Sequence, residues 1–218
     1  MLDLLKRQFV VLGGGGHGAV VADLLQAIGC DILGVADPSK AAGVEVLPTV
    51  RVVASDEEIM AMGADAVYLA MGLGSIKSNH TRAQVFNRFE AAGFVFPPLV
   101  HPTATIAQSC VIGAGSQIMA GAVVQARTAI GRNSIVNTRS SVDHDCKIGN
   151  HVHIAPGAIL SGGVRVADGA HVGTGATVIQ SIVIGSAAVV GAGVSVLRNV
   201  PENTVIRAYE TSVWCNDQ

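Results

Sequence analysis

From Ile106 onward every sixth residue is aliphatic, and the series continues without a break to Val196. Four positions after each of these residues stands a small or β-branched one, as at Cys110, Ser116 and Ala122. A fixed six-residue period predicts a β-solenoid, in which each unit buries its apolar face on its neighbours. An α-helix needs a period of about 3.6 and a single strand a period of about 2. The second half of the chain is therefore expected to be a stack of short strands.

A second period lies on top of the first. Glycine recurs on an eighteen-residue grid at Gly113, Gly131, Gly149 and Gly185, and Ala167 fills the missing place. Three six-residue units therefore make one coil, which predicts a triangular prism whose coils stack at roughly 4.8 Å. We expect glycine at the corners because it tolerates left-handed backbone angles.

The chain of 218 residues is apolar but poor in aromatic side chains. Half of the residues are hydrophobic and 4% are aromatic, so the core is expected to consist of Val, Ile and Ala. The net charge of −2 does not point to nucleic acid or anionic lipid as a partner. No unbroken apolar run reaches about 18 residues, and the N-terminus lacks the layout of a signal peptide. We therefore expect a cytoplasmic protein.

The first hundred residues follow another pattern, in which short apolar runs alternate with segments of helical spacing. This alternation predicts a small parallel α/β, Rossmann-like domain over residues 1–100, followed by an all-β solenoid and C-terminal tail over residues 101–218. The expected strands are Phe9–Leu12, Asp31–Ala36, Ala66–Met71 and Phe94–Phe96. The expected helices are Ala19–Ile28, Asp56–Met62 with Ser55 as N-cap, and Asn79–Ala92.

A glycine-rich turn joins the first strand to the first helix. Gly13, Gly15 and Gly18 match the G-x-G-x-x-G pattern of dinucleotide-binding turns, and Asp37 ends the next strand. Free backbone N–H groups at the start of a helix attract phosphate. A domain of about 100 residues has no room for a full dinucleotide fold plus a substrate domain. The pattern therefore favours a nucleotide diphosphate over NAD, with a purely structural turn as the other alternative.

Two groups of segments resemble a known enzyme family over nearly the whole chain. The first is Leu12–Gly18, Gly72–Ser75 and Arg82, and the second is Val136–Thr138, Val142–Cys146 and His153–Gly157. Together with the repeats they resemble the hexapeptide-repeat acyltransferases, and among these the bacillosamine and perosamine N-acetyltransferases, which are grouped with sialic acid O-acetyltransferases. The resemblance implies a left-handed parallel β-helix and a homotrimer.

The resemblance also implies a reaction, the transfer of acetyl from acetyl-CoA to the amino group of a UDP- or GDP-linked 4-amino-6-deoxy sugar. An O-acetyltransferase of the sialic acid type is the alternative, because an alcohol needs the same base. His144 matches the general base and Asp145 the acidic residue beside it. Matching contacts to the nucleotide sugar are Gly15, Gly16, His17, Asp37 and Gly72. Matching contacts to acetyl-CoA are His153, Gly162, Thr174 and Ala192, with Asn137 and Asp143 in support.

This reaction needs such residue types. A sugar ammonium must lose a proton before its nitrogen attacks a thioester, and histidine, which titrates near neutrality, can take that proton. An adjacent carboxylate fixes the histidine tautomer and stabilises the imidazolium. The oxyanion needs a backbone N–H, which a glycine such as Gly162 can present. No metal is expected, because the thioester is already activated.

The repeat places the two histidines of this set on different parts of the prism. His144 falls at a corner, whereas His153 precedes Ile154 and points outward. One face spans roughly 15 Å, so a single subunit does not bring the two side chains together. We therefore expect an active site between the subunits of a cyclic oligomer. His171 follows His153 by one coil and is assigned a structural role.

Two features depart from the family pattern. The usual Gly-x-Pro-Ala segment is replaced by Val200-Pro201 and then Arg207–Glu210, which leaves the contacts at the CoA end of the solenoid open. Ala36 stands where many relatives carry a second acid before Asp37, which leaves the acceptor nucleotide open. A zinc-binding shell like the carbonic anhydrases of this fold is a further alternative, but the histidines do not follow its pattern.

Overall fold

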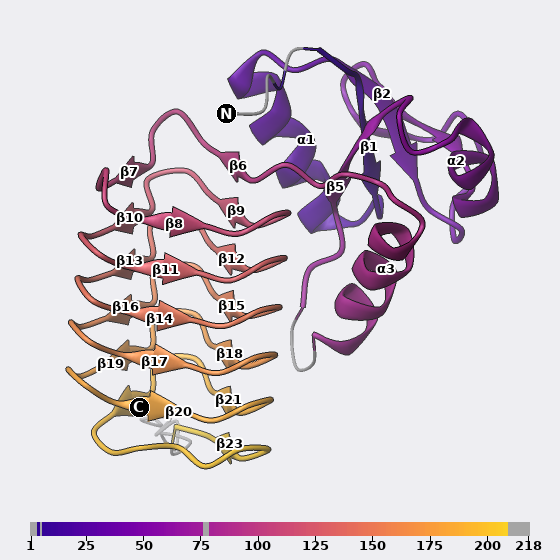
Figure 1. Ribbon diagram of the computed structural model, residues 1–218. Helices are drawn as coiled ribbons and strands as arrows, with labels where there is room; N and C mark the ends of the chain where they lie inside the picture. The colour runs from indigo at the N-terminus through magenta and orange to yellow at the C-terminus, as the bar shows by residue number, and fades with distance from the viewer. Residues whose placement is uncertain (1–3, 5, 76–78, 209–218) are drawn as a thin grey trace, which may run out of the picture.

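The computed structural model describes residues 4, 6–75 and 79–208, which form an α/β domain followed by a prism of short strands (Figure 1). The predicted fold class, an α/β domain and then a hexapeptide-repeat β-helix, is confirmed. The expected division at residue 100 falls directly after β6 (Leu99–Val100), which pairs with β9 (Gln117–Ile118) of the prism. Tyr209 and Glu210 lie outside the described residues. No helix in the described ranges is long and apolar enough to cross a membrane.

The α/β domain is built on a sheet with the strand order β3-β4-β2-β1-β5. Its strands are β1 (Phe9–Leu12), β2 (Ile32–Ala36), β3 (Glu45–Leu47), β4 (Val50–Ala54) and β5 (Tyr68–Met71). Its helices are α1 (Gly16–Ile28), α2 (Asp56–Met62) and α3 (His80–Ala91). The central strands run parallel as predicted. Ser55 caps α2 as predicted, in a capping box with Glu58.

Two expectations about this domain are wrong. Residues Phe94–Phe96 form no strand, because the rings of Phe94 and Phe96 turn into the core and pack against Phe89 and Phe86 of α3. The sheet is also not wholly parallel, since β3 pairs antiparallel with β4. This hairpin carries the sheet edge beyond β2.

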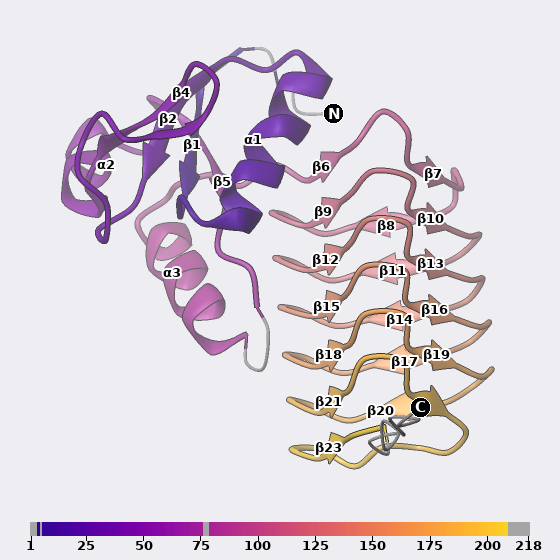
Figure 2. The ribbon, with the colours of Figure 1, turned by 180° about the vertical axis from the view of Figure 1, so that it is seen from behind.

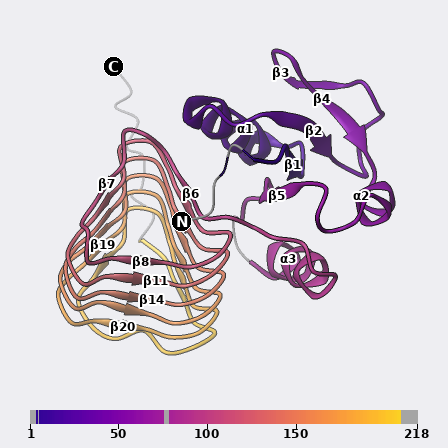
Figure 3. The same cartoon turned by 45° about the horizontal axis from the view of Figure 1, so that its top comes forward.

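The prism consists of two-residue strands, one for each six-residue unit. They are β6, β7 (Thr105–Ile106), β8 (Val111–Ile112), β9, β10 (Val123–Val124), β11 (Ala129–Ile130), β12 (Ile135–Val136), β13 (Ser141–Val142), β14 (Lys147–Ile148), β15 (His153–Ile154), β16 (Ile159–Leu160), β17 (Arg165–Val166), β18 (His171–Val172), β19 (Thr177–Val178), β20 (Val183–Ile184), β21 (Val189–Val190), β22 (Ser195–Val196) and β23 (Val205–Ile206). They form a seven-stranded, a six-stranded and a five-stranded parallel sheet. Seen from above, the three sheets enclose a triangular core (Figure 3).

The sequence period sets the register of these sheets. From β6 to β22 the paired residues are eighteen positions apart, as His153 and His171 are, whereas β21 pairs with β23 at an offset of sixteen. The second residue of each strand points inward, and the inward residues from Ile118 to Val196 form one continuous apolar core. This confirms the prediction of three six-residue units in each coil.

The reason for the glycine grid differs from the one expected. Gly131 and its grid partners are not in the left-handed region. A Cβ on Gly131 would lie 2.4 Å from the carbonyl oxygen of Gly149, in the next coil, so glycine is needed because two backbones approach closely. The left-handed positions are other corner residues, among them Gly115 and Asp145.

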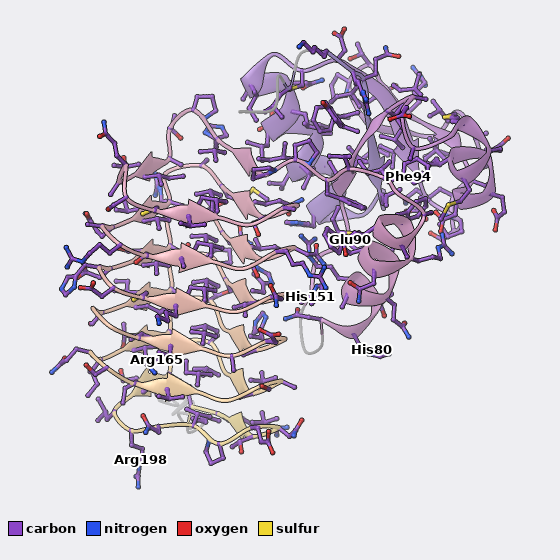
Figure 4. All side chains as sticks on the ribbon, in the orientation of Figure 1. His80, Glu90, Phe94, His151, Arg165 and Arg198 are labelled. Carbon is purple, nitrogen blue, oxygen red and sulfur yellow. The ribbon has the colours of Figure 1, made fainter. Side chains whose placement is uncertain are left out.

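The α/β domain packs on the seven-stranded sheet, beside the upper coils (Figure 2). Leu99 and Ile135 of this sheet, and Met119 directly after β9, belong to the same apolar cluster as Phe9 and Leu24 of the α/β domain. A second contact between the two parts lies at the prism corner between β14 and β15, where His151 faces α3 (Figure 4). The two parts therefore share a core, which fixes the glycine turn against the solenoid.

Candidate active site

A cavity of about 800 Å³ lies where the glycine turn meets the seven-stranded sheet. The sequence-predicted residues that line it are Gly15, Gly16, His17, Gly72, Asn137 and His153. Residues more than a hundred positions apart are thus brought to one place by the docking of the two domains. Leu73, Gly74, Ser75, Thr138 and Pro156, to which no separate role was assigned, line it too.

The glycine turn is shaped by close contacts between backbones. A Cβ on Gly18 would lie 2.0 Å from the carbonyl oxygen of Gly13, and one on Gly72 would lie 2.4 Å from the same atom. The turn leads into α1 at Gly16, and no side chain caps this helix. The first N–H groups of α1 therefore remain available at the cavity.

Asp37 holds this turn but does not line the large cavity. Its carboxylate accepts hydrogen bonds from Gly14 N (2.8 Å), Ser39 N (2.9 Å) and Ser39 Oγ (2.6 Å). Burial opposes ionisation, but these hydrogen bonds outweigh it and lower the pKa of Asp37. A smaller cavity of about 310 Å³ opens on the other side of the turn, next to Lys40 and Glu45.

His153 joins the α/β domain to the solenoid. Its Nδ1 lies 2.8 Å from the hydroxyl of Ser75, which can donate or accept, and 3.1 Å from the carbonyl oxygen of Ser75, which can only accept, so Nδ1 carries a hydrogen. Its Nε2 then accepts from Asn137 Nδ2 at 2.9 Å, while Asn137 Oδ1 accepts from Thr138 N at 2.7 Å. Burial lowers the pKa of His153 to about 3, so the ring is neutral and its orientation is fixed.

A second groove, of about 540 Å³, begins below His153. His171 lines it, and its ring stands perpendicular to that of His153 with centroids 4.9 Å apart. Burial lowers the pKa of His171. Thr174 and Ala192 also line this groove, and they continue the eighteen-residue column that begins with Thr138 and Pro156 in the large cavity. The two hollows therefore follow one edge of the prism.

His144 occupies a different corner, between β13 and β14, and its side chain is 56% exposed. Its Nδ1 lies 2.7 Å from Asp145 Oδ2, so Nδ1 carries a hydrogen and Nε2 keeps a free lone pair. Arg127, one coil earlier, donates two hydrogen bonds to the carboxylate of Asp145, at 2.6 and 2.7 Å. These hydrogen bonds and the one from His144 hold the pKa of Asp145 well below its usual range. Asp143 accepts from the backbone N of His144 at 2.7 Å.

Gly162 lies directly against the imidazole of His144. A Cβ at this position would come within 2.5 Å of Cε1 and 2.6 Å of Nε2. The absence of a side chain at Gly162 therefore makes room for the ring. The predicted site residues fall into two groups, since neither His144 nor Gly162 lines the large cavity or the second groove.

Two buried polar residues were given no role from the sequence. Gln117 is fully buried although it stands at an outward position of β9. Arg82 is 2% exposed and lies between the two domains. A polar residue at an outward position of a solenoid strand reads as solvated, so only the docking of the α/β domain reveals Gln117.

Family models match both parts of the chain. The PglD N-terminal domain matches residues 8–89, and the bacterial transferase hexapeptide model (six repeats) matches residues 127–162 and 145–180. A curated GDP-perosamine N-acetyltransferase of Escherichia coli is 39% identical over 62 residues, a stretch that spans 28% of this chain and 28% of that relative.

Solved structures match over nearly the full length. The acetyltransferase domain of PglB from Neisseria gonorrhoeae in complex with acetyl coenzyme A is 35% identical, with a TM-score of 0.84 and coverage of 91% of this chain and 95% of that one. PerB from Caulobacter crescentus in complex with CoA and GDP-perosamine is 33% identical, with a TM-score of 0.84 and coverage of 94% and 95%. Fold, repeats and relatives thus define an acetyltransferase of the hexapeptide-repeat class with an N-terminal α/β domain. Within this class, the chain belongs to the family of perosamine- and bacillosamine-type N-acetyltransferases.

Proposed function

We propose that this protein transfers the acetyl group of acetyl-CoA to the amino group of a nucleotide-linked 4-amino-6-deoxy sugar. The observation that carries the proposal is the 2.7 Å contact between His144 Nδ1 and Asp145, which leaves Nε2 as a proton acceptor. Two of the matched structures support the choice of substrates. The PglB acetyltransferase domain holds acetyl coenzyme A, and PerB holds CoA together with GDP-perosamine.

The large cavity suits the nucleotide sugar. Its glycine turn offers backbone N–H groups to the diphosphate, and His17 and Asn137 offer polar atoms to the sugar. Because Asp37 braces the turn from behind, its role is to hold Gly14 in place for this contact. We propose GDP or UDP as the nucleotide, with the smaller cavity beside Lys40 available to its nucleoside part.

The second groove suits acetyl-CoA. It follows the prism edge past Thr174 and Ala192, and an extended pantetheine arm fits such a narrow edge. Arg207 lines its lower part and carries the positive charge that CoA phosphates need. At the upper end the groove meets His153, so the thioester would reach the cavity that holds the sugar.

His144 acts as the general base in this proposal. Its Nε2 takes a proton from the sugar amine as the nitrogen forms a bond to the thioester carbon. The tetrahedral intermediate then collapses, the carbon–sulfur bond breaks, and the imidazolium returns a proton to the sulfur. Asp145 stabilises the imidazolium throughout, and the N–H of Gly162 is the proposed oxyanion donor.

The base and the cavity come from different subunits in this proposal. Within one chain, His144 stands at the corner between β13 and β14, whereas the cavity opens on the seven-stranded sheet. A cyclic homotrimer would place the His144 corner of one prism against the cavity of the next. The same contact would enclose acetyl-CoA between neighbouring prisms.

The test is product formation from acetyl-CoA with a panel of GDP- and UDP-linked amino sugars and their hydroxyl analogues, followed by mass spectrometry. We expect acetylation of an amino sugar, and His144→Asn should slow it by about 10²–10⁴-fold. His101→Asn, on the first coil, is the matched control and should leave the rate unchanged. Acetylation of a hydroxyl analogue alone, or full activity of His144→Asn, would overturn the proposal.

A further inference from the structure

Gln117 is a buried amide at the contact between the two domains. It stands at the outward position of β9 and has no exposed surface, because the α/β domain covers it. Its side chain reaches three groups of that domain, namely Met71, Arg82 and His17. A buried amide needs a partner for both its nitrogen and its oxygen, so these contacts fix its orientation.

The partners of Gln117 determine which end of its amide is the nitrogen and which is the oxygen. Its Nε2 donates to the carbonyl oxygen of Met71 at 2.8 Å, and that oxygen can only accept. Its Oε1 therefore faces Arg82 Nη2 at 3.2 Å and His17 Nε2 at 2.9 Å. Since an amide oxygen can only accept, His17 Nε2 must carry a hydrogen.

The opposite nitrogen of His17 is left as an acceptor. Burial and the charge of Arg82 lower the pKa of His17 to about 4, against the opposing effect of Gln117, so the ring is neutral at pH 7. A neutral ring with a hydrogen on Nε2 has a bare lone pair on Nδ1. Within residues 4, 6–75 and 79–208, Nδ1 has no hydrogen-bond partner, and the ring lines the large cavity.

Arg82 keeps this arrangement in place. Its guanidinium donates to the carbonyl oxygens of Met71, Leu73 and Asn133 as well as to Gln117. Burial lowers the pKa of Arg82 to about 9, so it remains charged at pH 7. No carboxylate of the described part of the chain pairs with it. An unneutralised cation behind Gln117 disfavours a second proton on His17.

We propose that Gln117 is a positioning residue that presents His17 Nδ1 to the cavity as a hydrogen-bond acceptor. The group recognised there is then a donor of the substrate, a sugar hydroxyl or an amine N–H, and not a phosphate oxygen. The diphosphate is left to the backbone N–H groups of the glycine turn. The identity of the ligand rests on the proposed function, whereas the state of His17 does not.

The first test reads the tautomer directly in the free protein. ¹⁵N-labelled histidine gives two-bond ¹⁵N–¹H correlation patterns that distinguish the two neutral tautomers, and the His17 signals are assigned by their loss in His17→Gln. We expect the Nε2–H form at pH 7, and the same form down to about pH 5. A His17 signal in the Nδ1–H form, or an imidazolium at pH 7, would overturn the proposal.

The second test compares Gln117→Met with Gln26→Met, a control on the exposed face of α1. Methionine keeps the length of the side chain but removes the acceptor. In Gln117→Met we expect His17 to lose its fixed tautomer. The KM for GDP-perosamine should then rise about tenfold, with a smaller change in kcat, because Nδ1 of His17 is no longer held as an acceptor for the ligand. An unchanged tautomer and KM would overturn the proposal.

A third variant gives a rescue. Gln117→Glu restores an acceptor for His17 Nε2, so the Nε2–H form should return, and the added carboxylate should move the titration of His17 to higher pH. Failure of this variant to restore the Nε2–H form would count against the proposal. If neither GDP-perosamine nor a UDP-linked amino sugar is acetylated, the proposed function fails, while the tautomer remains readable in the free protein.

Discussion

The imidazole of His144 lies directly against Gly162 of the next coil, so close that a Cβ there would come within 2.5 Å of its Cε1. The ring is thus held from below by backbone and from the side by Asp145. A half-exposed side chain needs such support to serve as the proposed base, since an exposed side chain otherwise samples several rotamers. Gly162 therefore helps to position the proposed base, in addition to its proposed role toward the oxyanion.

Replacing this glycine should displace the base. In Gly162→Ala, the new methyl group must push the ring of His144 out of its place, so we expect kcat to fall about 10- to 100-fold. The backbone of Gly162 is not left-handed, so the thermal midpoint of unfolding should change little. Ser161→Ala is the neighbouring control. Normal kcat in Gly162→Ala would show that the contact does not matter for catalysis.

The carboxylate beside His144 should act by accepting a hydrogen bond from Nδ1. Asp145→Ala removes the acceptor and should lower kcat about tenfold or more, whereas Asp145→Asn retains an oxygen that can accept and should fall between Asp145→Ala and the native protein. Steady-state kinetics of the three proteins gives this order. Equal loss in both variants would mean that charge, and not tautomer control, is the decisive property.

The buried histidines should make the fold sensitive to mild acid. Burial lowers the pKa of His153 to about 3 and that of His17 to about 4, whereas an unfolded histidine titrates near 6.5. Below about pH 6.5 the unfolded chain takes up protons that the native state refuses. The free energy of unfolding should therefore fall as the pH drops from about 6.5 toward 4, by about 1.4 kcal/mol per pH unit for each such histidine.

Urea unfolding between pH 7 and pH 5 measures this slope. His153→Gln should make it shallower by the share of one histidine, and His101→Gln, which changes a histidine near the surface of the first coil, serves as the control. Identical slopes in all three proteins would contradict the assignment of His153 as a neutral buried ring.

A site shared between subunits should allow complementation. His144→Asn removes the base and His17→Ala alters the cavity, so each homo-oligomer should be nearly inactive. Co-expressed with two different affinity tags, the mixed oligomers should regain a substantial fraction of the activity, since some sites then combine two native halves. Mixed oligomers that stay inactive, or an active monomer in light scattering, would contradict the proposed arrangement.

Local patterns predicted much of the fold because they report local physics. The six-residue period fixed the coil, the strand centres and the stacking of His153 on His171. The hairpin of β3 and β4 escaped prediction because Glu45–Leu47 is three residues long and has no alternating pattern. The apolar run at Phe94–Phe96 was wrongly predicted to be a strand. Its two phenylalanine rings pack in the core of the α/β domain, and the segment forms no strand of the sheet.

Part of the site could not be read from neighbours in sequence. Gln117 is recognisable only when the α/β domain covers the seven-stranded sheet, and although Arg82 belongs to the segments that carry the resemblance, its burial against Gln117 appears only in the docked domains. The glycine grid was found, but its cause was not, because backbone proximity between coils is a property of the stacked prism. The roles of the site residues came from the family resemblance. The contacts of His144 and His153 give each of these proposed roles a specific hydrogen bond that can be tested.

The column of Thr138, Pro156, Thr174 and Ala192 has a further consequence. Each residue lies one coil below the last, so distances along this edge come only in steps of roughly 4.8 Å. Evolution cannot tune the separation of the two hollows continuously. It can only add or remove a whole coil. Because the arm of the co-substrate has a fixed length, a coil can be added or removed only outside the part of the prism along which the arm lies.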